Sequence, residues 1–311
     1  MWQSLVPDLG FVMLPREGRV ADEQVERIDL AVFSSDLWRE GRSSTFMRVL
    51  LDAPRAVWLH MFSAGLDNPV FAVLGERGIT VTHSAGSSAV PIAHTVMMQL
   101  IAMCRRGRGW HLAQADRRWD LGEVDDVEGR RVTVVGLGAI GAEVARLAQQ
   151  FGMHVTGLRR SPDGSEPCTT VPIGELHTVL PHTDDLVLTA PLTAETRGII
   201  GERELALLPA GARLVNVGRG ELVDEAALVE ALRAGHLGAA ALDVFTTEPL
   251  PDESPLWSMP NVLVSPHSSG STDLAEQRAA DVFHENLRRF ATGEPLRNVG
   301  YGSEFPAMQP R

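Results

Sequence analysis

A glycine-rich hexapeptide, GLGAIG at residues 136–141, constrains the fold of this 311-residue chain more than any other feature. It follows an apolar run at residues 131–135 and precedes a segment with the composition of a helix. In such a strand–loop–helix context, the first glycine permits a tight turn, the second lets the backbone approach a pyrophosphate, and the third lets helix and strand pack closely. The helix N-terminus then faces the phosphates. The hexapeptide therefore predicts a dinucleotide-binding unit, with a purely structural turn as the alternative.

Short apolar runs continue to alternate with helix-like segments after this loop, which favours a doubly wound parallel α/β sheet. A smaller α/β unit comes before it, and residues 273–292 have the pattern of a long amphipathic helix. We predict that residues 1–98 and 272–311 form one domain and residues 99–271 the other. The strands expected in the second domain are at residues 131–135, 155–158, 185–190, 213–217, 239–243 and 261–264.

The chain contains no lysine, so all 28 of its Lys and Arg positions are arginine. This excludes Schiff-base catalysis, pyridoxal phosphate attachment and the P-loop lysine. Forty acidic residues against those 28 give a net charge of −12, which disfavours a nucleic acid or an anionic membrane as the partner. An anionic ligand must therefore be captured by a local group of arginine or histidine side chains.

The sequence contains no uninterrupted run of eighteen apolar residues, so we expect no membrane span. The first residues, MWQSLVPDLG, lack a basic region followed by an apolar core, so we expect no signal peptide. Cys104 and Cys168 are too few for a disulfide framework or a zinc cluster, and no spacing of His, Asp or Glu indicates a metal site. A cytoplasmic setting fits this cysteine usage.

The end of the strand after the glycine loop indicates which dinucleotide is bound. An NAD site usually has Asp or Glu about 20 residues on, bonding the ribose 2′-hydroxyl. Here Arg159, Arg160 and Ser161 occupy that place, and Asp163 comes too late to replace the acid. Arginine binds a 2′-phosphate through charge-assisted hydrogen bonds, whereas a carboxylate at this place would repel the phosphate. We therefore predict NADP(H), with NAD(H) as the alternative; the other reading is that both arginines are merely solvated.

Three further apolar runs, within residues 214–270, each lead into polar residues. In a parallel sheet these residues lie in loops at the carboxyl ends of the strands, where open α/β sheets bind ligands. The loops carry Arg219, Glu248 and His267. An anion binder, an acid and a proton donor suit chemistry on a carbonyl compound that bears a carboxylate.

These motifs resemble the D-isomer-specific 2-hydroxyacid dehydrogenases. The resemblance covers nearly the whole chain and is densest in GLGAIG, in APLTAETRGII at residues 190–200, and in the runs VNVGRGELVDEAAL, ALDVFTTEPLP and SPHSSG. It implies a Rossmann domain inserted into a discontinuous flavodoxin-like substrate domain, and a homodimer formed through the cofactor domain. A C-terminal regulatory domain of the kind that some phosphoglycerate dehydrogenases carry is not expected here.

The resemblance also implies roles for individual residues. Arg219 matches the arginine that holds the substrate carboxylate and carbonyl oxygen, Glu248 the acid paired with the histidine, and His267 the general acid/base. The backbone amides of Ser63, Ala64 and Gly65 match the loop that receives the substrate carboxylate. The cofactor contacts implied by the motif and the resemblance are Gly136, Gly138, Ala139, Ile140, Gly141, Arg159, Arg160, Ser161, Ala190, Val217, Gly218, Asp243 and Gly270. Among these, Ala139 and Ile140 are expected on the pyrophosphate, Val217 and Gly218 beside the nicotinamide, and Asp243 near its carboxamide.

The arginines at the strand end resemble the glyoxylate/hydroxypyruvate reductase branch. We therefore expect an NADPH-preferring reductase of small 2-keto acids. An NAD-dependent dehydrogenase of bulkier or phosphorylated 2-hydroxy acids, such as phosphoglycerate, is one alternative, and a non-catalytic dinucleotide-sensing protein is another. Trp110 and Trp119 lie where a loop could reach a dimer partner's active site, but packing is the favoured role for them.

Overall fold

The structure is a computed structural model that describes residues 10–66 and 68–306. The prediction that there is no signal peptide used residues 1–10, and residues 1–9 lie outside the described ranges. The chain divides into two compact units, of which the first comprises Met1–Ser88 and Thr272–Arg311 and the second Ala89–Ser271. The first division thus falls between Ser88 and Ala89 rather than after residue 98. The reason is that helix α6 (Ala89–Cys104) packs mainly on helix α8 (Ala139–Gln150) of the second unit.

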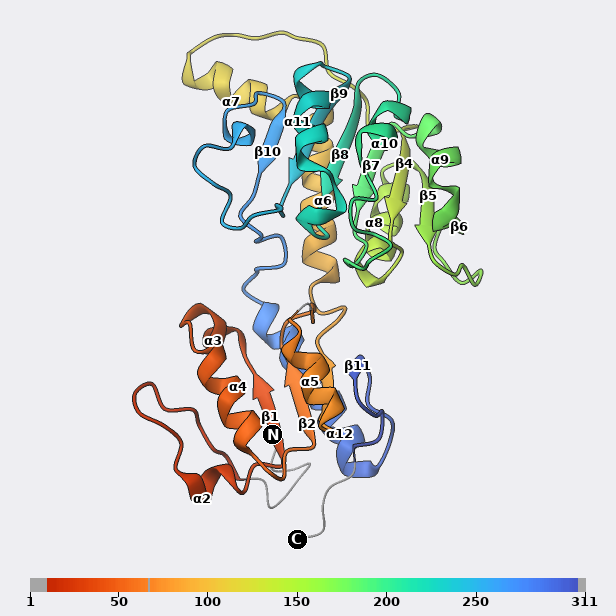
Figure 1. Ribbon diagram of the computed structural model, residues 1–311. Coiled ribbons are helices and arrows are strands. Elements are labelled where there is room, and N and C mark those ends of the chain that lie inside the picture. The colour runs from red at the N-terminus through yellow and green to blue at the C-terminus, as the bar shows by residue number, and fades with distance from the viewer. Residues whose placement is uncertain (1–9, 67, 307–311) are drawn as a thin grey trace. The chain divides into compact units, whose positions relative to one another are not determined.

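The second unit is built on a sheet with the strand order β10-β9-β8-β7-β4-β5-β6, in which all neighbours are parallel (Figure 1). From the central strand β4 the chain moves outward to β5 and β6, then returns to β7 on the other side of β4. The winding direction therefore reverses between β4 and β7, as the doubly wound prediction requires. The strands are β4 (Arg131–Val135), β5 (His154–Arg159), β6 (Thr169–Pro172), β7 (Asp185–Leu188), β8 (Ala212–Asn216), β9 (Leu237–Leu242) and β10 (Val262–Val264).

Helices cover both faces of this sheet. Side chains alternate between the faces along β7, where Leu186 and Leu188 join one apolar core and Val187 joins the other. The core around Val187 lies under α6 and α8, and the core around Leu186 lies under the helices that cross the opposite face. Burial on both faces explains why the strands read as nearly continuous apolar runs in the sequence. The other helices of this unit are α7 (Gly107–Ala115), α9 (Leu176–Val179), α10 (Glu202–Leu207) and α11 (Glu225–Arg233), with 3₁₀ turns at Ile173–Glu175, Leu180–His182, Gly220–Leu222 and Pro255–Trp257.

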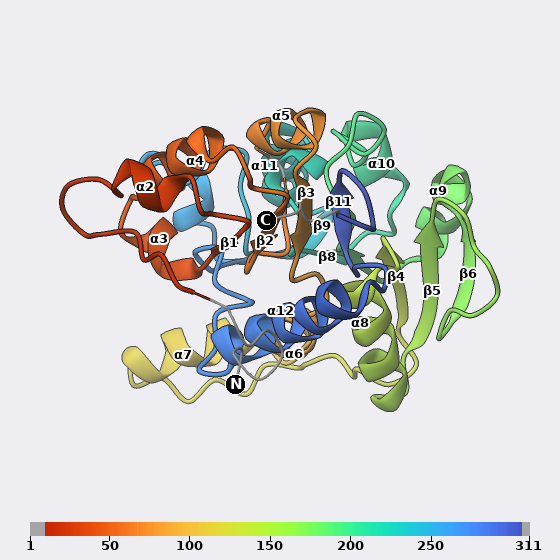
Figure 2. The same ribbon diagram turned by 90° about the horizontal axis from the view of Figure 1, so that it is seen from below.

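The first unit has a smaller sheet with the order β1-β2-β3-β11, in which β11 runs antiparallel to β3. One face carries a core that includes Leu50 and Leu74, and the other packs Trp58 against Phe283 and Leu287. Figure 2 shows that helices lie on both faces of this sheet. The elements are α2 (Asp22–Val25), β1 (Leu30–Phe33), α3 (Ser35–Arg39), α4 (Ser43–Asp52), β2 (Trp58–Met61), α5 (Val70–Glu76), β3 (Thr80–His83), α12 (Ala275–Thr292) and β11 (Val299–Tyr301).

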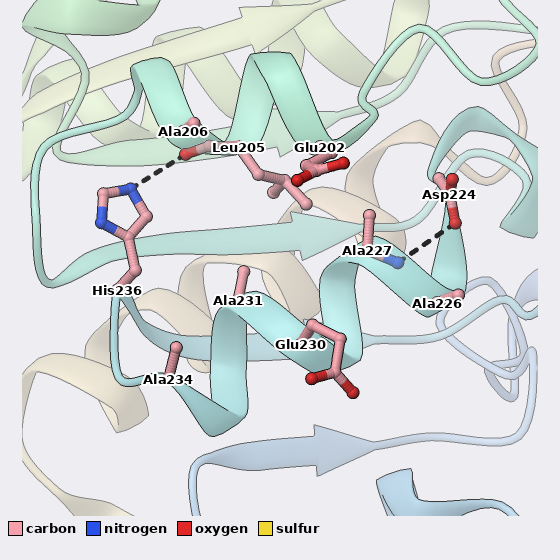
Figure 3. A pocket seen from close by; sticks show the side chains of 10 residues that line it. All are labelled: Glu202, Leu205, Ala206, Asp224, Ala226, Ala227, Glu230, Ala231, Ala234 and His236. Carbon is pink, nitrogen blue, oxygen red and sulfur yellow. Dashed lines mark hydrogen bonds between the residues drawn. The ribbon is translucent and has the colours of Figure 1, made fainter.

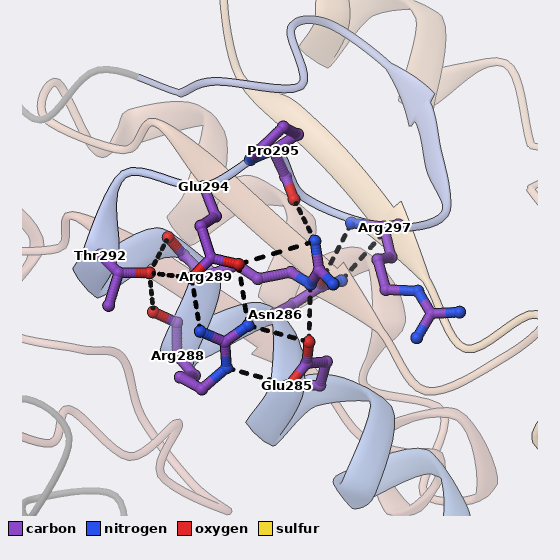
Figure 4. A network of polar contacts seen from close by, with 8 residues as sticks. All are labelled: Glu285, Asn286, Arg288, Arg289, Thr292, Glu294, Pro295 and Arg297. Atoms are coloured by element: carbon purple, nitrogen blue, oxygen red, sulfur yellow. Dashed lines mark hydrogen bonds and ion pairs between the residues drawn. The ribbon is translucent and has the colours of Figure 1, made fainter.

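The carboxyl end of α12 is joined to the segment before β11 by a polar network (Figure 4). The fully buried side chain of Asn286 donates to the carbonyl of Arg297 at 3.0 Å and accepts from its amide at 2.8 Å. Glu294 accepts from Arg288 at 2.9 Å, and hydrogen bonds from Arg288 and then Thr292 lower the pKa of Glu294 to about 2. These contacts set the position of β11 at the sheet edge after the long helix has ended.

The fold class predicted from the sequence is confirmed, with three local differences. Residues 10–14 are apolar enough for a strand, but they are irregular in the structure, where Phe11 and Met13 are exposed. The short edge strands β6 and β11 were not recognised, since half-exposed edge strands lack the continuous apolar pattern of the central ones.

Candidate active site

The residues predicted to bind the cofactor or to act in catalysis in the second unit gather at one edge of its sheet. Each lies at the carboxyl end of β4, β5, β7, β8, β9 or β10 or in the loop after it, and these strands are consecutive in the sheet. The point where the winding direction reverses, between β4 and β7, lies among these strands. Parallel α/β sheets bind ligands outside the carboxyl ends of their strands, at such a switch point.

The glycine loop at the switch point fits a dinucleotide pyrophosphate. Gly136 has φ +100°, and a Cβ atom there would lie 2.5 Å from the Cα of Ala190, in the loop after β7. A Cβ at Gly141 would lie 2.2 Å from the carbonyl oxygen of Gly136. Gly138 is the N-cap of α8, whose first turn contains Ala139 and Ile140. Because Gly136 and Gly141 lack side chains, the helix N-terminus and its amide groups can lie this close to the strand end, whereas a Cβ at Gly138 would meet nothing within 4 Å.

The two arginines at the end of β5 have different surroundings. The guanidinium of Arg159 pairs with Glu166 at 2.8 Å and with Asp163 at 3.5 Å. Glu166 is nearly buried and also accepts from the amides of Asp163 and Gly164, so it organises the turn and is not available to a ribose hydroxyl. Arg160 is exposed, and no residue in the described ranges pairs with it. Both arginines were predicted to bind the phosphate, and the structure distinguishes their surroundings: Arg159 is paired with two carboxylates, and Arg160 is exposed.

Arg160 and Ser161 remain the available groups at this strand end. Both are exposed. The pKa of Glu195, in the loop after β7, is lowered mainly by a hydrogen bond from the Thr193 hydroxyl and to a smaller extent by the charge of Arg160.

Glu248 and His267, predicted as a pair, are in contact. Oε2 of Glu248 lies 2.8 Å from Nδ1 of His267, and Oε1 accepts from the amide of Phe245 at 3.0 Å. The carboxylate is thus held by its own loop while it accepts from the imidazole. Nδ1 must carry the hydrogen in this bond, so Nε2 is the ring nitrogen that can exchange a proton with a ligand.

The backbone that carries His267 is held by Asp243. His267 has φ +48°, a left-handed conformation that is uncommon for a residue with a side chain. Its amide donates to the carbonyl of Asp243 at 2.8 Å. The buried Asp243 carboxylate accepts from the Ser265 hydroxyl at 2.6 Å, the Ser268 amide at 3.0 Å and the Ser269 amide at 3.1 Å. The prediction placed Asp243 only beside the cofactor; in the structure its carboxylate also shapes the turn that presents the histidine.

Arg219 lies in the loop after β8. This strand pairs with β9, and the loop after β9 carries Glu248. Nη1 of Arg219 donates to the carbonyl of Gly218 at 2.7 Å, and the arginine's own carbonyl accepts from the side chain of Asn216 at 2.9 Å. Asn216 also accepts from the Gly218 amide at 3.1 Å. The buried Asn216 therefore braces the turn through Val217 and Gly218 that carries the half-buried arginine. Gly270 lies at the same edge of the sheet, in the loop after β10.

In the first unit, Ser63, Ala64 and Gly65 follow the carboxyl end of β2. The hydroxyl of Ser63 donates to the carbonyl of Gly65 at 3.2 Å. His83, at the end of β3, donates from Nδ1 to the carbonyl of Ala64 at 2.6 Å. The predicted carboxylate-binding loop is therefore a structured turn.

A groove on the second unit lies apart from these loops. It runs between α10 and α11, and five of the ten residues that line it are alanines (Figure 3). Two of its polar side chains are used within the protein: Asp224 accepts from the Ala227 amide, and His236 donates to the Leu205 carbonyl. The groove thus offers no chemistry comparable with that of the strand ends. Within residues 10–66 and 68–306, no group of His, Cys, Asp and Glu is arranged to hold a metal ion, and no helix there is long and apolar enough to cross a bilayer.

Sequence reasoning missed Asn216, Ser265 and His83 as supporting residues. Asn216 and Ser265 each stand at the end of an apolar run, directly before a predicted functional loop, and that position was the available signal. His83 carries a weaker signal, because it ends a short strand in the part of the chain where no motif stands out.

Comparisons with known proteins agree with this geometry. Residues 97–269 match the family described as D-isomer specific 2-hydroxyacid dehydrogenase, NAD binding domain. A glyoxylate reductase from Korarchaeum cryptofilum is 35% identical over 261 residues, covering 79% of this chain and 76% of that protein. A D-3-phosphoglycerate dehydrogenase from Methanocaldococcus jannaschii is 34% identical over 239 residues, which are 76% of this chain but only 45% of that relative's length.

A solved structure agrees over most of the chain. The D-isomer specific 2-hydroxyacid dehydrogenase from Xanthobacter autotrophicus Py2, in complex with NADPH and MES, is 32% identical. It superposes with a TM-score of 0.79 and covers 96% of this chain and 91% of that one. The family match covers more than half of the chain, and it includes the loops at the strand ends. The chain therefore belongs to the D-isomer-specific 2-hydroxyacid dehydrogenases, a family of NAD(P)-dependent oxidoreductases.

Proposed function

We propose that the protein reduces small 2-keto acids, glyoxylate and hydroxypyruvate first among them, to D-2-hydroxy acids with NADPH. The observation that carries this proposal is the 2.8 Å pair between Glu248 and His267 at the edge of the sheet where Arg219 also lies. The printed names of relatives, glyoxylate reductase and glyoxylate/hydroxypyruvate reductase B, support the substrate class.

In this proposal each residue has one task. The cofactor supplies a hydride to the carbonyl carbon. His267 donates a proton from Nε2 to the developing alkoxide, and Glu248 stabilises the imidazolium through Nδ1. Arg219 binds the substrate carboxylate and polarises the carbonyl oxygen, for which its planar guanidinium is suited. The amides of the loop at Ser63–Gly65 receive the carboxylate, so the first unit serves as the substrate domain and the second as the dinucleotide domain.

The preference for NADPH rests on Arg160 and Ser161. An exposed arginine without a carboxylate partner in the described ranges can bind a 2′-phosphate, whereas Glu166, the nearby acid, is occupied by Arg159 and two backbone amides. The structural relative from Xanthobacter autotrophicus was solved with NADPH, which supports the same cofactor here. Gly136, Gly138, Gly141 and the first turn of α8 would hold the pyrophosphate, with Ala190, Val217, Gly218, Asp243 and Gly270 lining the rest of the site.

A substrate panel assayed with both cofactors tests the proposal. Purified protein is mixed with glyoxylate, hydroxypyruvate, pyruvate or phosphohydroxypyruvate, and the oxidation of NADPH and NADH is followed. The proposal predicts the highest kcat/KM for glyoxylate or hydroxypyruvate with NADPH. His267→Gln should lower kcat by roughly 10²–10⁴-fold, the range for loss of a general acid.

The panel also identifies two alternatives. Fastest turnover of phosphohydroxypyruvate with NADH would favour the phosphoglycerate type of activity that the name of the Methanocaldococcus jannaschii relative suggests. Tight binding of the dinucleotide without turnover of any keto acid would favour a sensing protein. Either result would refute the proposed reaction.

We further propose that the protein forms a homodimer through the second unit. Helix α7 and the segment after it expose Trp110, Leu112, Trp119 and Leu121, of which Trp119 is 90% exposed. Exposed apolar groups of this size within one segment indicate a surface that is covered in the assembled protein. Light scattering should give twice the chain mass, and Leu112→Glu with Trp119→Glu should shift it to the single chain; a monomeric wild-type protein would contradict the proposal. The cytoplasmic location stays a prediction.

A further inference from the structure

The turn after β2 in the first unit has all three of its carbonyl groups engaged. The carbonyl of Ser63 accepts from the Ser84 amide at 3.1 Å, that of Ala64 from His83 Nδ1 at 2.6 Å, and that of Gly65 from the Ser63 hydroxyl at 3.2 Å. Two of the three donors come from the end of β3 and the residue after it. The turn is therefore anchored to the neighbouring strand through its carbonyl oxygens.

This anchoring decides where the amide groups of the turn point. In a planar trans peptide, the carbonyl and the following N–H point in opposite directions. Since the carbonyls of Ser63 and Ala64 face the end of β3, the N–H groups of Ala64 and Gly65 face away from it. Among the described residues, none accepts a hydrogen bond from either amide. Two adjacent amides with this common direction are suited to a carboxylate oxygen.

We propose that His83 is a positioning residue for the substrate carboxylate, because its bond to the Ala64 carbonyl aims the amides of the Ser63–Gly65 turn. The inference rests on the proposed function, since it takes the ligand of the turn to be the carboxylate of a 2-keto acid. His83 itself does not touch the substrate in this account. A carbonyl oxygen only accepts, so Nδ1 carries the hydrogen, and the bond needs no charge on the ring.

Replacement of His83 by two residues of similar shape isolates the hydrogen bond. Asn places a nitrogen donor the same number of bonds from Cα as Nδ1 of histidine, whereas Leu places a methyl group there. His83→Leu should raise KM for the keto acid about tenfold, the effect of losing one well-placed hydrogen bond. KM for NADPH should stay within about twofold of the wild-type value. In His83→Asn, KM for the keto acid should be close to that of the wild type.

Three kinetic results would overturn the inference. They are an unchanged KM for the keto acid in His83→Leu, an equal loss in His83→Asn and His83→Leu, and a parallel rise of KM for NADPH in His83→Leu. The last would mean that the substitution damages the fold generally, because no cofactor residue is assigned to the first unit.

A second readout separates this inference from the proposed function. Oxalate, a planar dianion of similar size to glyoxylate, is titrated calorimetrically into NADP⁺-loaded protein. If the wild-type protein reduces no keto acid but binds oxalate, the proposed function fails, and weaker binding to His83→Leu but not to His83→Asn still upholds the role of His83. Equal binding to wild type and His83→Leu overturns that role alone. A wild-type protein that neither binds oxalate nor reduces any keto acid overturns both.

Discussion

Gly220 packs directly on the backbone of Phe245: a Cβ atom at Gly220 would lie 1.9 Å from the carbonyl carbon of Phe245. Gly220 follows Arg219, and the amide of Phe245 donates to Glu248, which in turn contacts His267. The loops after β8, β9 and β10 therefore form one packed structure. A change that separates Gly220 from Phe245 should displace the arginine from the acid–histidine pair.

We expect Gly220→Ala to destabilise the second unit and to impair the reaction, because the added methyl group meets backbone that cannot rotate away. The cost of such overpacking is about 1–3 kcal/mol in the free energy of unfolding, measured by urea denaturation. The value of kcat/KM for the keto acid should fall more than the affinity for NADPH. Gly174→Ala is the matched control, since a Cβ at Gly174 meets nothing within 4 Å. Equal stability and activity of both variants would contradict the close approach.

Ser265→Ala tests the turn that presents His267. It removes one of the three hydrogen bonds that the Asp243 carboxylate accepts, while the two from the Ser268 and Ser269 amides remain. We expect kcat to fall about 3–10-fold, the effect of one hydrogen bond of about 1 kcal/mol on the placement of the imidazole. KM for NADPH should not change, because Ser265 is not assigned to the cofactor. Ser258→Ala, at an exposed serine in another loop, is the control and should leave kcat unaltered.

The two arginines at the end of β5 should behave differently in the cofactor assay. Arg160→Ala should raise KM for NADPH about 10–100-fold and leave KM for NADH nearly constant, because it removes a charge available to the 2′-phosphate. Arg159→Ala removes the partner of Glu166, so it should loosen the turn and raise KM for both cofactors. The same selective loss of NADPH use in Arg159→Ala would show that the Glu166 pair opens when the cofactor binds.

His60 should make the first unit sensitive to acid. The ring is fully buried, Nδ1 lies 2.8 Å from the Thr82 hydroxyl, and Nε2 lies 3.1 Å from the Ser84 hydroxyl. Burial, and to a smaller extent the charge of His83, lowers the pKa of His60 to about 3, whereas an unfolded histidine titrates near 6.5. The folded state therefore keeps His60 neutral, and its stability is complete above about pH 6.5 and falls progressively as the pH drops toward 3.

Between pH 8 and pH 5 this histidine should account for a loss of about 2 kcal/mol in the free energy of unfolding, at 1.36 kcal/mol per pH unit. Urea denaturation at the two pH values measures it. His60→Asn should be less stable at pH 8 but lose less on acidification than the wild type. His154→Asn, at an exposed histidine, should keep the wild-type difference. A wild-type difference that His60→Asn retains in full would assign the acid sensitivity to other groups.

Much of the second unit could be predicted from local pattern. The strand expected at residues 131–135 is β4, and the helix expected after the glycine loop is α8, which begins at Ala139. The contact between Glu248 and His267 was also expected, because the resemblance pairs the acid with the histidine; both residues follow buried strands of one parallel sheet. Such strands are buried on both faces, so their apolar runs are long enough to recognise, and the glycines occur where backbone packs on backbone.

Other contacts could not be predicted, because they join short polar side chains to backbone groups that only folding brings near. The pairing of Arg159 with Glu166 depends on a turn at Asp163 and Gly164, and the bond from His83 to Ala64 joins two different strand ends. Neither contact produces a periodic pattern in the sequence.

By itself, the sequence determined the doubly wound fold, the dinucleotide loop and the residue types available for chemistry, since apolar period and glycine position depend on neighbours a few residues away. The tertiary structure decided which polar groups are committed and which remain available: Arg159 is held and Arg160 is exposed, and Asp243 shapes the turn that carries His267. The physical reason is that a hydrogen bond needs its partners within about 3 Å and well aligned. Loops from separate strands reach that arrangement only once the sheet has assembled.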